Sequence, residues 1–343
     1  MAMPSSSAAA AAPSWWIETC FQFLDVASEA LESEGLSVKA QGSFAQGLAL
    51  EGSDLDAVIY QQGSQAPKGK PLVKALTNAS HRVMNHINSG KAGPYMHIKT
   101  IERIPWARIP LIKLKFTWGW PSRRGAPWTV EVDLSYGDET RGSYDKRIGD
   151  LVASRPDLRN FLQSLKGWAV SQEDNILDSQ HQALSTFALI LLGLCYYNKS
   201  LRVARSVTLA GFFDFIYRDI GELHTSICHV WVEEGQYKHV ADDEDTSGHL
   251  TRSPFKILVP GEGPESNAAR SLSRKMWTEV VFPAFQRAAG RNRRRVESAY
   301  AASSVRGGTG SRKSGVAVGK QLGKGRRHTT NGPVLCRASG KLR

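Results

Sequence analysis

Apolar residues in the first 136 positions switch repeatedly between helical and strand spacing. Trp16, Phe23 and Ala27 recur on one side of a helix predicted over residues 15–31, and Gly35 follows as its stop. Short runs of alternating or continuous apolar residues predict strands at 36–40, 54–60, 97–103, 109–116 and 129–136, and a further helix is expected at 72–87. Helices and strands interspersed in this way predict a mixed α/β lobe.

After Tyr136 the pattern becomes helical. Apolar residues at helical spacing predict helices at 158–168, 184–197, 209–220 and 273–288. The longest apolar run, residues 183–197, is about fifteen residues long, whereas a membrane-spanning helix needs roughly 20, so no membrane association is expected. The run is apolar nearly all round, which is typical of a buried core helix. The fold class is therefore α/β (α+β), with a mixed-sheet lobe followed by a mostly helical lobe.

The two ends of the chain differ in composition from the rest. Residues 1–14 are rich in Ala and Ser and lack the basic start and apolar stretch of a secretory signal, which predicts a disordered leader. Beyond about residue 290 the sequence is rich in Gly, Ser and Arg, and we expect disorder there as well. The predicted division is a leader at 1–14, a first helix at 15–35, the mixed lobe at 36–136, the helical lobe at 137–288 and a basic tail at 289–343.

The formal net charge of +12 comes from the tail. Of the 44 Lys and Arg residues, 15 lie at or after Arg287 together with one of the 32 acidic residues, so positions 1–286 carry 29 basic and 31 acidic side chains. The body is therefore nearly neutral, whereas the tail has the charge to bind RNA phosphates without sequence preference. Its candidate RNA contacts are Arg291, Arg293, Arg294 and Arg295. The same run is compatible with a nuclear localisation signal or with a solubilising end.

The four cysteines lie at positions 20, 195, 228 and 336, and no two of them form a Cys-x-x-Cys motif. This spacing argues against a disulfide framework and a zinc ribbon, and it fits an intracellular compartment, which is the cytoplasm, the nucleus or an organelle. Cys228 and His229, with His224 and His239 nearby, match no standard spacing of zinc ligands. We therefore assign no zinc site there.

Two weak signals for chemistry lie close together in the mixed lobe. Gly42 and Ser43 follow a predicted strand, where glycine allows a tight turn and the Ser43 hydroxyl and nearby amides can contact phosphate oxygens. Asp54 and Asp56 lie two residues apart on a predicted strand, so both carboxylates point to one face and Leu55 points to the other. Two such carboxylates repel each other unless a cation lies between them, and an oxygen-only site suits Mg²⁺. Each motif alone is also common as an ordinary turn or a solvated strand start.

A third carboxylate on a neighbouring strand would complete a two-metal site. The predicted strand at 129–136 alternates so that Glu131 and Asp133 face away from its valines, and we select Asp133, with Glu131 as the alternative. Two Mg²⁺ or Mn²⁺ ions roughly 3.5–4 Å apart can clamp the attacking and leaving oxygens of an in-line displacement. In this scheme Asp54 and Asp56 hold both ions and the triphosphate. Asp133 completes the ion that lowers the pKa of an attacking hydroxyl.

Residues 42–56, Gly-Ser-Phe-Ala-Gln-Gly-Leu-Ala-Leu-Glu-Gly-Ser-Asp-Leu-Asp, resemble the signature of the polymerase-β-type nucleotidyltransferases. The resemblance is closest to the terminal uridylyltransferases and noncanonical poly(A) polymerases, and it extends from about residue 16 to residue 285. Further segments follow in the family's order, at 107–115 with 132–135, at 156–168, at 184–187, and at 253–255 with 267–270. The resemblance implies a nucleotidyltransferase palm lobe packed on a helical, PAP-associated lobe, with the active site in the cleft between them. It also implies that the first helix joins the helical lobe.

The resemblance further implies that the donor nucleotide contacts six residues, Gly42, Ser43, Lys166, Thr186, Phe187 and Asn267. Lys166 lies off the apolar stripe of its helix and is expected to reach phosphates, although an ordinary solvated lysine is the competing interpretation. Thr186 keeps the hydroxyl of a family Ser. Phe187 keeps an aromatic face that can stack on a base, with simple core packing as its rival role.

Four positions depart from the family pattern, and all four concern nucleotide recognition. Val170 stands where a second Lys is usual, and Arg141 begins the segment that replaces the Asn that reads the ribose hydroxyl. We expect Arg141 to supply a substitute charge. Ser253 replaces the acid before Pro-Phe, and Ser266 replaces the uridine-reading His. These changes weaken the case for UTP selectivity, while the intact Asp triad argues against an inactive enzyme.

The sequence therefore predicts a template-independent RNA nucleotidyltransferase. It would add UMP or AMP from UTP or ATP to RNA 3′ ends and release pyrophosphate, as a monomer or within an RNA-processing complex. One alternative is a catalytically weak or inactive nucleotide- or RNA-binding scaffold, which the departures motivate. Another is transfer to a non-RNA acceptor, as in antibiotic nucleotidyltransferases that share the triad, and the helical lobe disfavours it.

Deleting residues 291–343 should weaken RNA binding, because the deletion removes most of the excess positive charge. Each phosphate that a protein neutralises on single-stranded nucleic acid adds about −0.7 to the slope of log affinity against log salt concentration. Binding titrations at several salt concentrations should therefore give a shallower slope for the truncated protein. An unchanged slope would show that the tail makes no phosphate contacts.

Overall fold

The computed structural model of the protein describes residues 12–92, 96–107, 109–119, 128–224, 226–241, 253–262 and 266–290. All described residues belong to one compact unit, which lies within Met1–Arg294. The tail arginines predicted to contact RNA, Arg291 and residues 293–295, lie outside the described residues, as does the predicted leader up to residue 11.

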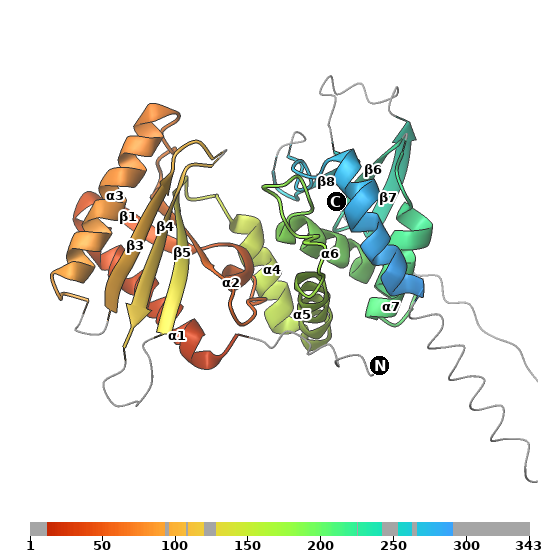
Figure 1. Ribbon diagram of the computed structural model, residues 1–343, viewed down its shortest axis with the longest axis horizontal. Helices are drawn as coiled ribbons and strands as arrows, with labels where there is room; N and C mark the ends of the chain where they lie inside the picture. The colour runs from red at the N-terminus through yellow and green to blue at the C-terminus, as the bar shows by residue number, and fades with distance from the viewer. Residues whose placement is uncertain are drawn as a thin grey trace, which may run out of the picture. The chain divides into compact units, whose positions relative to one another are not determined.

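A five-stranded mixed sheet forms the first lobe (Figure 1). Its strands are β1 Leu36–Ala40, β2 Leu55–Gln61, β3 Met96–Ile104, β4 Leu111–Trp118 and β5 Trp128–Tyr136. In the spatial order β1-β2-β5-β4-β3, neighbouring strands are antiparallel except for β2 and β5, which are parallel. The predicted strands agree with these bounds, identically for β1 and within about two residues for the other four.

Alternation along β2 and β5 separates a buried face of the sheet from an open face. Leu55 of β2 and both Val132 and Leu134 of β5 are fully buried, whereas Asp56 remains accessible to solvent. Because successive side chains of a strand point to opposite faces, a one-residue shift of either strand would turn this apolar set toward solvent. Burial of the apolar face therefore fixes the register that positions the acids on the open face.

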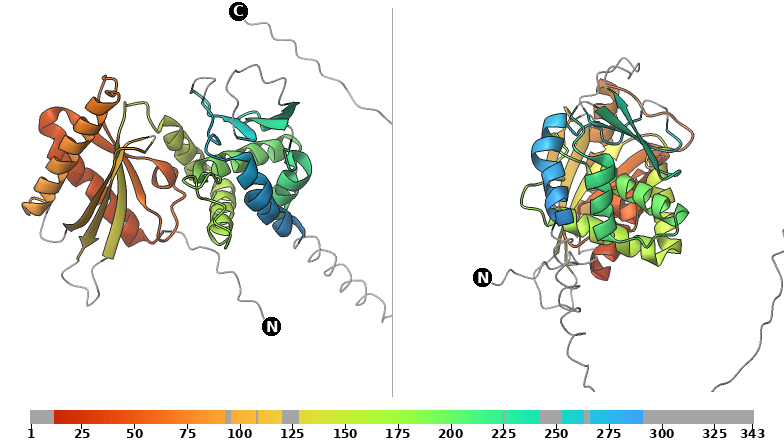
Figure 2. Two further views of the ribbon diagram at one scale, coloured as in Figure 1. Left: turned by 45° about the horizontal axis from the view of Figure 1, so that its top comes forward. Right: turned by 90° about the vertical axis from the view of Figure 1, so that its right-hand side faces the viewer.

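The covering helices are α1 Ser14–Leu31 and α3 Lys70–Asn88, with the short turn η1 Glu32–Glu34 after α1. Both helices pack on the buried face of the sheet (Figures 1 and 2). Phe23 of α1 is fully buried and stacks on Phe116 of β4, with 5.1 Å between the ring centroids. The expectation that the first helix joins the helical lobe is therefore wrong, because its apolar stripe contributes to the core of the first lobe.

The second lobe contains several helices and also a small sheet. Its helices are α4 Ser143–Ser154, α5 Pro156–Val170, α6 Thr186–Arg202, α7 Leu209–Asp214, η2 Phe215–Ile220, α8 Arg274–Met276 and η4 Trp277–Val281, followed by helical residues 282–290. Its strands are β6 Ser226–Trp231, β7 Gln236–Ala241 and β8 Phe255–Leu258, in the order β7-β6-β8. The prediction of a mostly helical lobe missed α4 and this sheet. The strands are short, and β6 pairs in parallel with a strand far along the chain.

Helix α6 lies at the centre of the second lobe. Its residues 188–197 are all buried, as the all-round apolar run predicts. The helix begins at Thr186 because the Ser185 hydroxyl caps it, accepting a hydrogen bond from the Ala188 amide at 3.1 Å. In the part of the chain that the structure describes, no helix combines the length and apolarity that a membrane span requires.

The two lobes meet where α2 Gly42–Ala45 packs against α4. Gly149 of α4 lies so close to the Ala45 carbonyl oxygen that a side chain at this position would clash with it. Leu48, which follows α2, is fully buried in the core of the second lobe. This contact places the start of α4 at the open face of the first sheet, where it lines a cavity together with Asp56 of β2 and Asp133 of β5.

Phe23→Ala should lower the free energy of unfolding by about 3–5 kcal/mol, the usual cost of removing a buried ring. The reason is the loss of the Phe23 contact with Phe116 in the core of the first lobe. Urea denaturation checks this, with Phe21→Ala as a matched control on the same helix, where the ring is 54% exposed. Equal losses in the two variants would contradict the placement of α1 in the core.

Candidate active site

The parallel pairing of β2 and β5 brings the predicted acids together. Asp56 and Asp133 are register partners across these two strands. Asp54 precedes Asp56 by two residues, and its charge interacts with both Asp56 and Asp133. The structure thus gathers Asp54, Asp56 and Asp133 in one region of the open face. Glu131, the alternative third acid, lies two residues before Asp133 and has no such partner on β2 among the register pairs.

Burial, together with neighbouring negative charge, raises the pKa values of these acids. Burial, followed by the charges of Asp133, Asp54 and Asp145, raises the pKa of Asp56 to about 7, while Lys166 acts in the opposite direction. Burial here means crowding by protein atoms, because the Asp56 side chain still reaches solvent. Burial likewise raises the pKa values of Asp54 and Asp133 above their usual range. A bound cation would favour the charged forms of these carboxylates.

Two lysines of β4 partly balance these acids. The Lys113 ammonium lies 3.5 Å from a carboxylate oxygen of Asp133, and the two residues are register partners between β4 and β5. Lys115 forms an ion pair with Glu131, its register partner, two residues away from Lys113 and Asp133 on the same two strands. Glu131 therefore has its own counter-charge and a more exposed side chain than Asp133. These observations favour Asp133 over Glu131 as the third acid.

Gly42 forms a tight turn directly against Asp56. Its φ of 58° lies in the left-handed region, and a Cβ at this position would overlap the Asp56 Oδ2 atom. The Gly42 amide donates a hydrogen bond to Asp145 at 3.0 Å, and the Gln46 side-chain amide donates another at 2.7 Å. Asp145 of α4 thus anchors the turn that carries Ser43. The sequence alone does not single out Asp145, because both hydrogen bonds come from residues about 100 positions away.

Lys166 is buried at the contact between the two lobes. Its side chain is only 6% exposed, so the competing interpretation as an ordinary solvated lysine is wrong, while its contact with phosphates stays a prediction. The ammonium donates hydrogen bonds to the Leu48 carbonyl at 3.2 Å and to the Ser53 hydroxyl at 3.3 Å. Burial lowers its pKa to about 8, while Asp56 and Asp54 raise it. Lys166 therefore links α5 to the connection that leads into β2.

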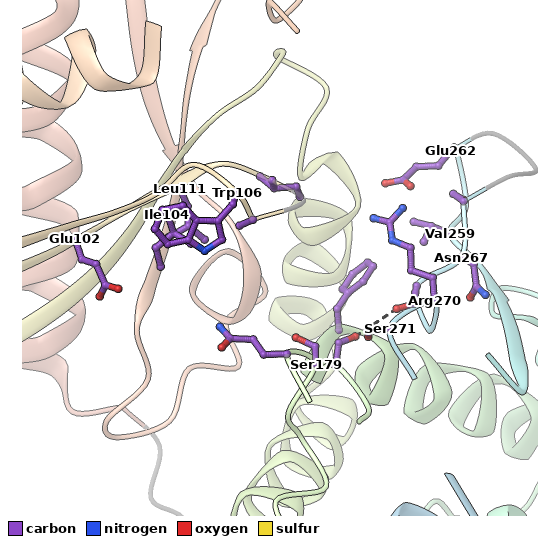
Figure 3. A pocket seen from close by; sticks show the side chains of 17 residues that line it. Glu102, Ile104, Trp106, Leu111, Ser179, Val259, Glu262, Asn267, Arg270 and Ser271 are labelled. Carbon is purple, nitrogen blue, oxygen red and sulfur yellow. Dashed lines mark hydrogen bonds between the residues drawn. The ribbon is translucent and has the colours of Figure 1, made fainter. Parts of the chain in front are cut away.

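Two adjoining cavities lie between the open face of the first sheet and the second lobe. The smaller, about 380 Å³, contains Asp56, Asp133 and Gly42, and the larger, about 980 Å³, extends from it. Figure 3 shows Ile104, Trp106 and Leu111 on one side of the larger cavity and Glu262, Asn267 and Arg270 on the other. Phe187 of α6 lines both cavities. These volumes are typical of pockets for small molecules of nucleotide size.

Asn267, a further predicted contact, holds the local backbone. Asn267 is 8% exposed, and its side-chain oxygen accepts hydrogen bonds from the Ile257 amide at 3.1 Å and the Ala269 amide at 2.9 Å. Its side-chain amide donates to the Phe255 carbonyl at 2.6 Å. Asn267 thus braces the wall of the larger cavity. Thr186 is partly buried at the start of α6, next to Phe187.

The positions that depart from the family pattern now have structural roles. Val170 stands at the position of the second lysine and is 59% exposed, so an uncharged side chain faces solvent at this point of α5. The Ser253 hydroxyl is buried, donates to the Ala269 carbonyl at 2.8 Å and accepts from the Phe255 amide at 3.2 Å. The Ser266 hydroxyl is buried at the wall of the larger cavity without a hydrogen-bond partner in the described part of the chain. Neither serine supplies a charge.

The donor set fits a divalent metal ion. Three carboxylates without sulfur or nitrogen ligands suit Mg²⁺ or Mn²⁺, and burial and neighbouring acids both disfavour their charged forms in the absence of a cation. Within the described ranges, no three His, Cys, Asp or Glu side chains are arranged so that they could hold a metal ion as they stand. Metal binding at Asp54, Asp56 and Asp133 therefore requires these side chains to converge.

Sequence comparison identifies a related domain in the first lobe. Residues 10–140 match the family described as "Poly(A) RNA polymerase, mitochondrial-like, central palm domain". This range contains the sheet, the turn at Gly42 and the three acids of the candidate site. No curated protein matches the chain in sequence.

Solved structures share the fold over most of the chain. A cytoplasmic RNA terminal U-transferase has a TM-score of 0.57 at 16% identity, covering 82% of this chain and 89% of the other. The Cid1 poly(U) polymerase, solved with Mg and 3′-dATP bound, has a TM-score of 0.58 at 17% identity, covering 81% and 89%. GLD-2 in its complex with RNP-8 has a TM-score of 0.57 at 13% identity, covering 82% and 90%. The chain therefore has the nucleotidyltransferase palm fold together with its second lobe.

Asp56→Asn should change how stability depends on pH. The folded pKa of Asp56, about 7, lies above its ordinary value of 3.8, so its contribution to stability is full below about pH 4 and is lost as pH rises through 7. Removing the charge should therefore make the variant increasingly more stable than the wild type between pH 4 and 8, as urea denaturation with EDTA would measure.

Asp150→Asn is the control for this effect, because Asp150 is an exposed acid of α4. Its stability difference from the wild type should vary little over the same range. Adding Mg²⁺ at pH 8 should stabilise the wild type more than Asp56→Asn, since a ligand that binds the folded state stabilises it. A pH-independent difference for Asp56→Asn would contradict the crowding of charge at Asp56.

Proposed function

We propose that the whole chain is an RNA nucleotidyltransferase, which the match of residues 10–140 to the central palm domain of mitochondrial-like poly(A) RNA polymerases supports. In this proposal it adds UMP or AMP to RNA 3′ ends without a template, in the manner of a terminal uridylyltransferase or poly(A) polymerase. The observation that carries the proposal is the pairing of Asp56 with Asp133 beside the Gly42 turn and a nucleotide-sized cavity.

The proposed reaction joins the RNA to the α-phosphate of the donor. The 3′-hydroxyl oxygen of the RNA attacks the α-phosphorus, the bond from that phosphorus to the bridging oxygen breaks, and pyrophosphate leaves. Asp54, Asp56 and Asp133 would hold two divalent ions, which neutralise the phosphates and lower the pKa of the attacking hydroxyl. The chain itself contributes orientation, because Asp145 and Lys166 hold the two segments that carry Gly42 and the Asp pair.

The donor nucleotide would lie along the two adjoining cavities. Its phosphates would occupy the smaller cavity near Gly42 and Ser43, and its base would stack on Phe187 in the larger one. Cid1 has been solved with Mg and 3′-dATP and with a UTP analogue, which supports a divalent ion and a nucleoside triphosphate as ligands of this fold. Asn267 would then shape the base pocket through the backbone that it braces.

RNA is the proposed acceptor. Cid1 has been solved with its short product ApU, and GLD-2 with RNP-8, so the fold occurs both with an RNA product and within a protein complex. We propose that this chain acts as a monomer or within an RNA-processing complex, inside the cell. Its basic tail would add affinity for RNA phosphates.

A scaffold that binds nucleotide or RNA without catalysis is the second candidate. Two observations favour it, namely the burial of Lys166 and the exposed Val170 in place of a second lysine. Both reduce the positive charge that α5 offers to a triphosphate. Retained RNA binding without any 3′ extension is the result that would select this candidate.

Replacing Asp54, Asp56 or Asp133 by Ala should reduce 3′ extension about 100-fold or more. Each variant removes a ligand of the proposed ions, and such ions supply several kcal/mol of charge stabilisation in the transition state. The assay incubates labelled RNA with Mg²⁺ or Mn²⁺ and each of the four NTPs in turn, which also measures base preference. Circular dichroism of each variant verifies the fold.

Glu131→Gln is the matched control, because Glu131 lies on the same strand and face but pairs with Lys115. It should retain most of the activity. Wild-type activity in any of the three Ala variants would refute the assigned site. Absence of extension by the wild-type protein with every nucleotide and both metals would refute the proposed enzyme.

A further inference from the structure

The smaller cavity is lined by four acids and one cation. Among its described lining residues, the acidic side chains are Asp56, Asp133, Asp145 and Glu262, and the only Lys or Arg is Arg141. Asp145 is committed to the Gly42 turn, and Asp56 and Asp133 belong to the proposed metal site. Arg141 is therefore the one protein cation in the lining that can meet an anion entering this cavity.

The Arg141 guanidinium is partly satisfied and lacks an ion-pair partner. One of its nitrogens donates to the Tyr136 carbonyl at 2.8 Å. The charges of Asp138 and Asp56 favour the guanidinium, but neither acid forms a salt bridge with it among the described residues. Asp138, the acid nearest in sequence, accepts hydrogen bonds from the Thr140 hydroxyl at 2.6 Å and from the Thr140 and Arg141 amides at 3.0 Å. Burying a charge without a partner is costly, so such a group beside a cavity indicates a ligand.

The backbone holds Arg141 in place. The side chain lies over Gly137, where an added Cβ would lie 2.5 Å from the Arg141 Cδ atom and 3.0 Å from Val58. The next residue, Gly142, has a φ of 76°, and a Cβ there would lie 2.9 Å from the Gln41 side-chain nitrogen. Gln41 directly precedes the Gly42 turn. Arg141 is thus seated beside the turn at which the proposed function places the phosphates.

The other candidate cations are engaged elsewhere. The Lys166 ammonium donates to Leu48 and Ser53, Val170 supplies no charge, and Lys113 pairs with Asp133. A triphosphate entering this acidic cavity still requires positive charge from the protein in addition to metal ions. A guanidinium offers a planar fork that matches two phosphate oxygens.

We propose that Arg141 binds a phosphate group of the donor nucleotide, from the α4 side of the smaller cavity. This inference rests on the proposed function, since it names a further contact of that same site. It differs from the sequence-based expectation by giving Arg141 a defined ligand, the triphosphate. A ribose hydroxyl is the competing ligand, and the two are separated by a probe that has phosphates but no sugar.

The test measures binding to the full-length protein by calorimetry in the presence of Mg²⁺. The probes are UTP, ATP, inorganic tripolyphosphate, uridine and adenosine. Arg141→Gln should weaken both nucleotides and tripolyphosphate by a similar factor, about tenfold to 100-fold, the usual effect of losing a charge-assisted hydrogen bond. Affinity for the two nucleosides should not change. Arg141→Lys, which keeps the charge but not the fork, should lie between wild type and Arg141→Gln.

Arg159→Gln is the matched control, because Arg159 is an exposed arginine of α5 outside both cavities. It should bind every probe as the wild type does. If Arg141→Gln weakens the nucleotides but leaves tripolyphosphate unchanged, Arg141 reads the sugar and the inference is overturned. Unchanged affinity for all probes, or no binding of tripolyphosphate by the wild type, overturns it as well.

RNA extension by the wild type, measured in parallel, keeps this inference separate from the proposed function. Extension together with unaltered phosphate binding in Arg141→Gln would overturn the role of Arg141 and leave the function standing. Arg141-dependent tripolyphosphate binding without extension would sustain the contact and refute the enzyme. If Arg141→Gln fails to fold, Arg141→Lys serves as the test. Wild-type affinity for tripolyphosphate in that variant would contradict bidentate binding by the guanidinium.

Discussion

Asp56 and Asp133 face each other across two parallel strands, and the same register that buries the apolar face of the sheet forces them together. The strands cannot slide to separate the two charges, because a shift by one residue would expose Leu55, Val132 and their neighbours. Hydrophobic burial thus holds like charges at close range. Burial and the neighbouring carboxylates raise the pKa of Asp56 to about 7. A bound cation would stabilise the charged form of these acids.

Charged side chains from neighbouring elements surround Asp56 and Asp133. Lys113 approaches Asp133 from the next strand, while Lys166 reaches across from α5 and contributes a favourable charge to Asp56. Asp145 adds a further negative charge, yet its carboxylate is occupied by two hydrogen bonds from the segment at Gly42 and Gln46. Lys166 and Asp145 both belong to the second lobe. The geometry of the acids therefore depends on contacts between the lobes, even though the acids themselves lie on the first.

The local pattern of the sequence is sufficient for the strands and for placing Asp56 and Asp133 on the same face of the sheet. Alternation over two residues determines which side chains share a face, and that is a property of β2 and β5 alone. It does not show what each apolar surface packs against. The family resemblance implied the helical lobe for α1, whereas its apolar residues pack in the core of the first lobe. The burial of Lys166 and the anchoring role of Asp145 escaped for the same reason. Each depends on hydrogen bonds between residues about 100 positions apart, such as that from Gln46 to Asp145.

The positive charges near the acids come from unequal places in the fold. Position 170 on α5 carries an exposed valine, and the α5 lysine at 166 is turned inward to support the loop before β2. A guanidinium has instead entered the cavity from the segment after β5, where Gly137 leaves room for it. A charge supplied there is attached directly to the strand that carries Asp133. Donor binding and the position of the third acid would then be coupled through β5, because moving one end of this strand displaces the other.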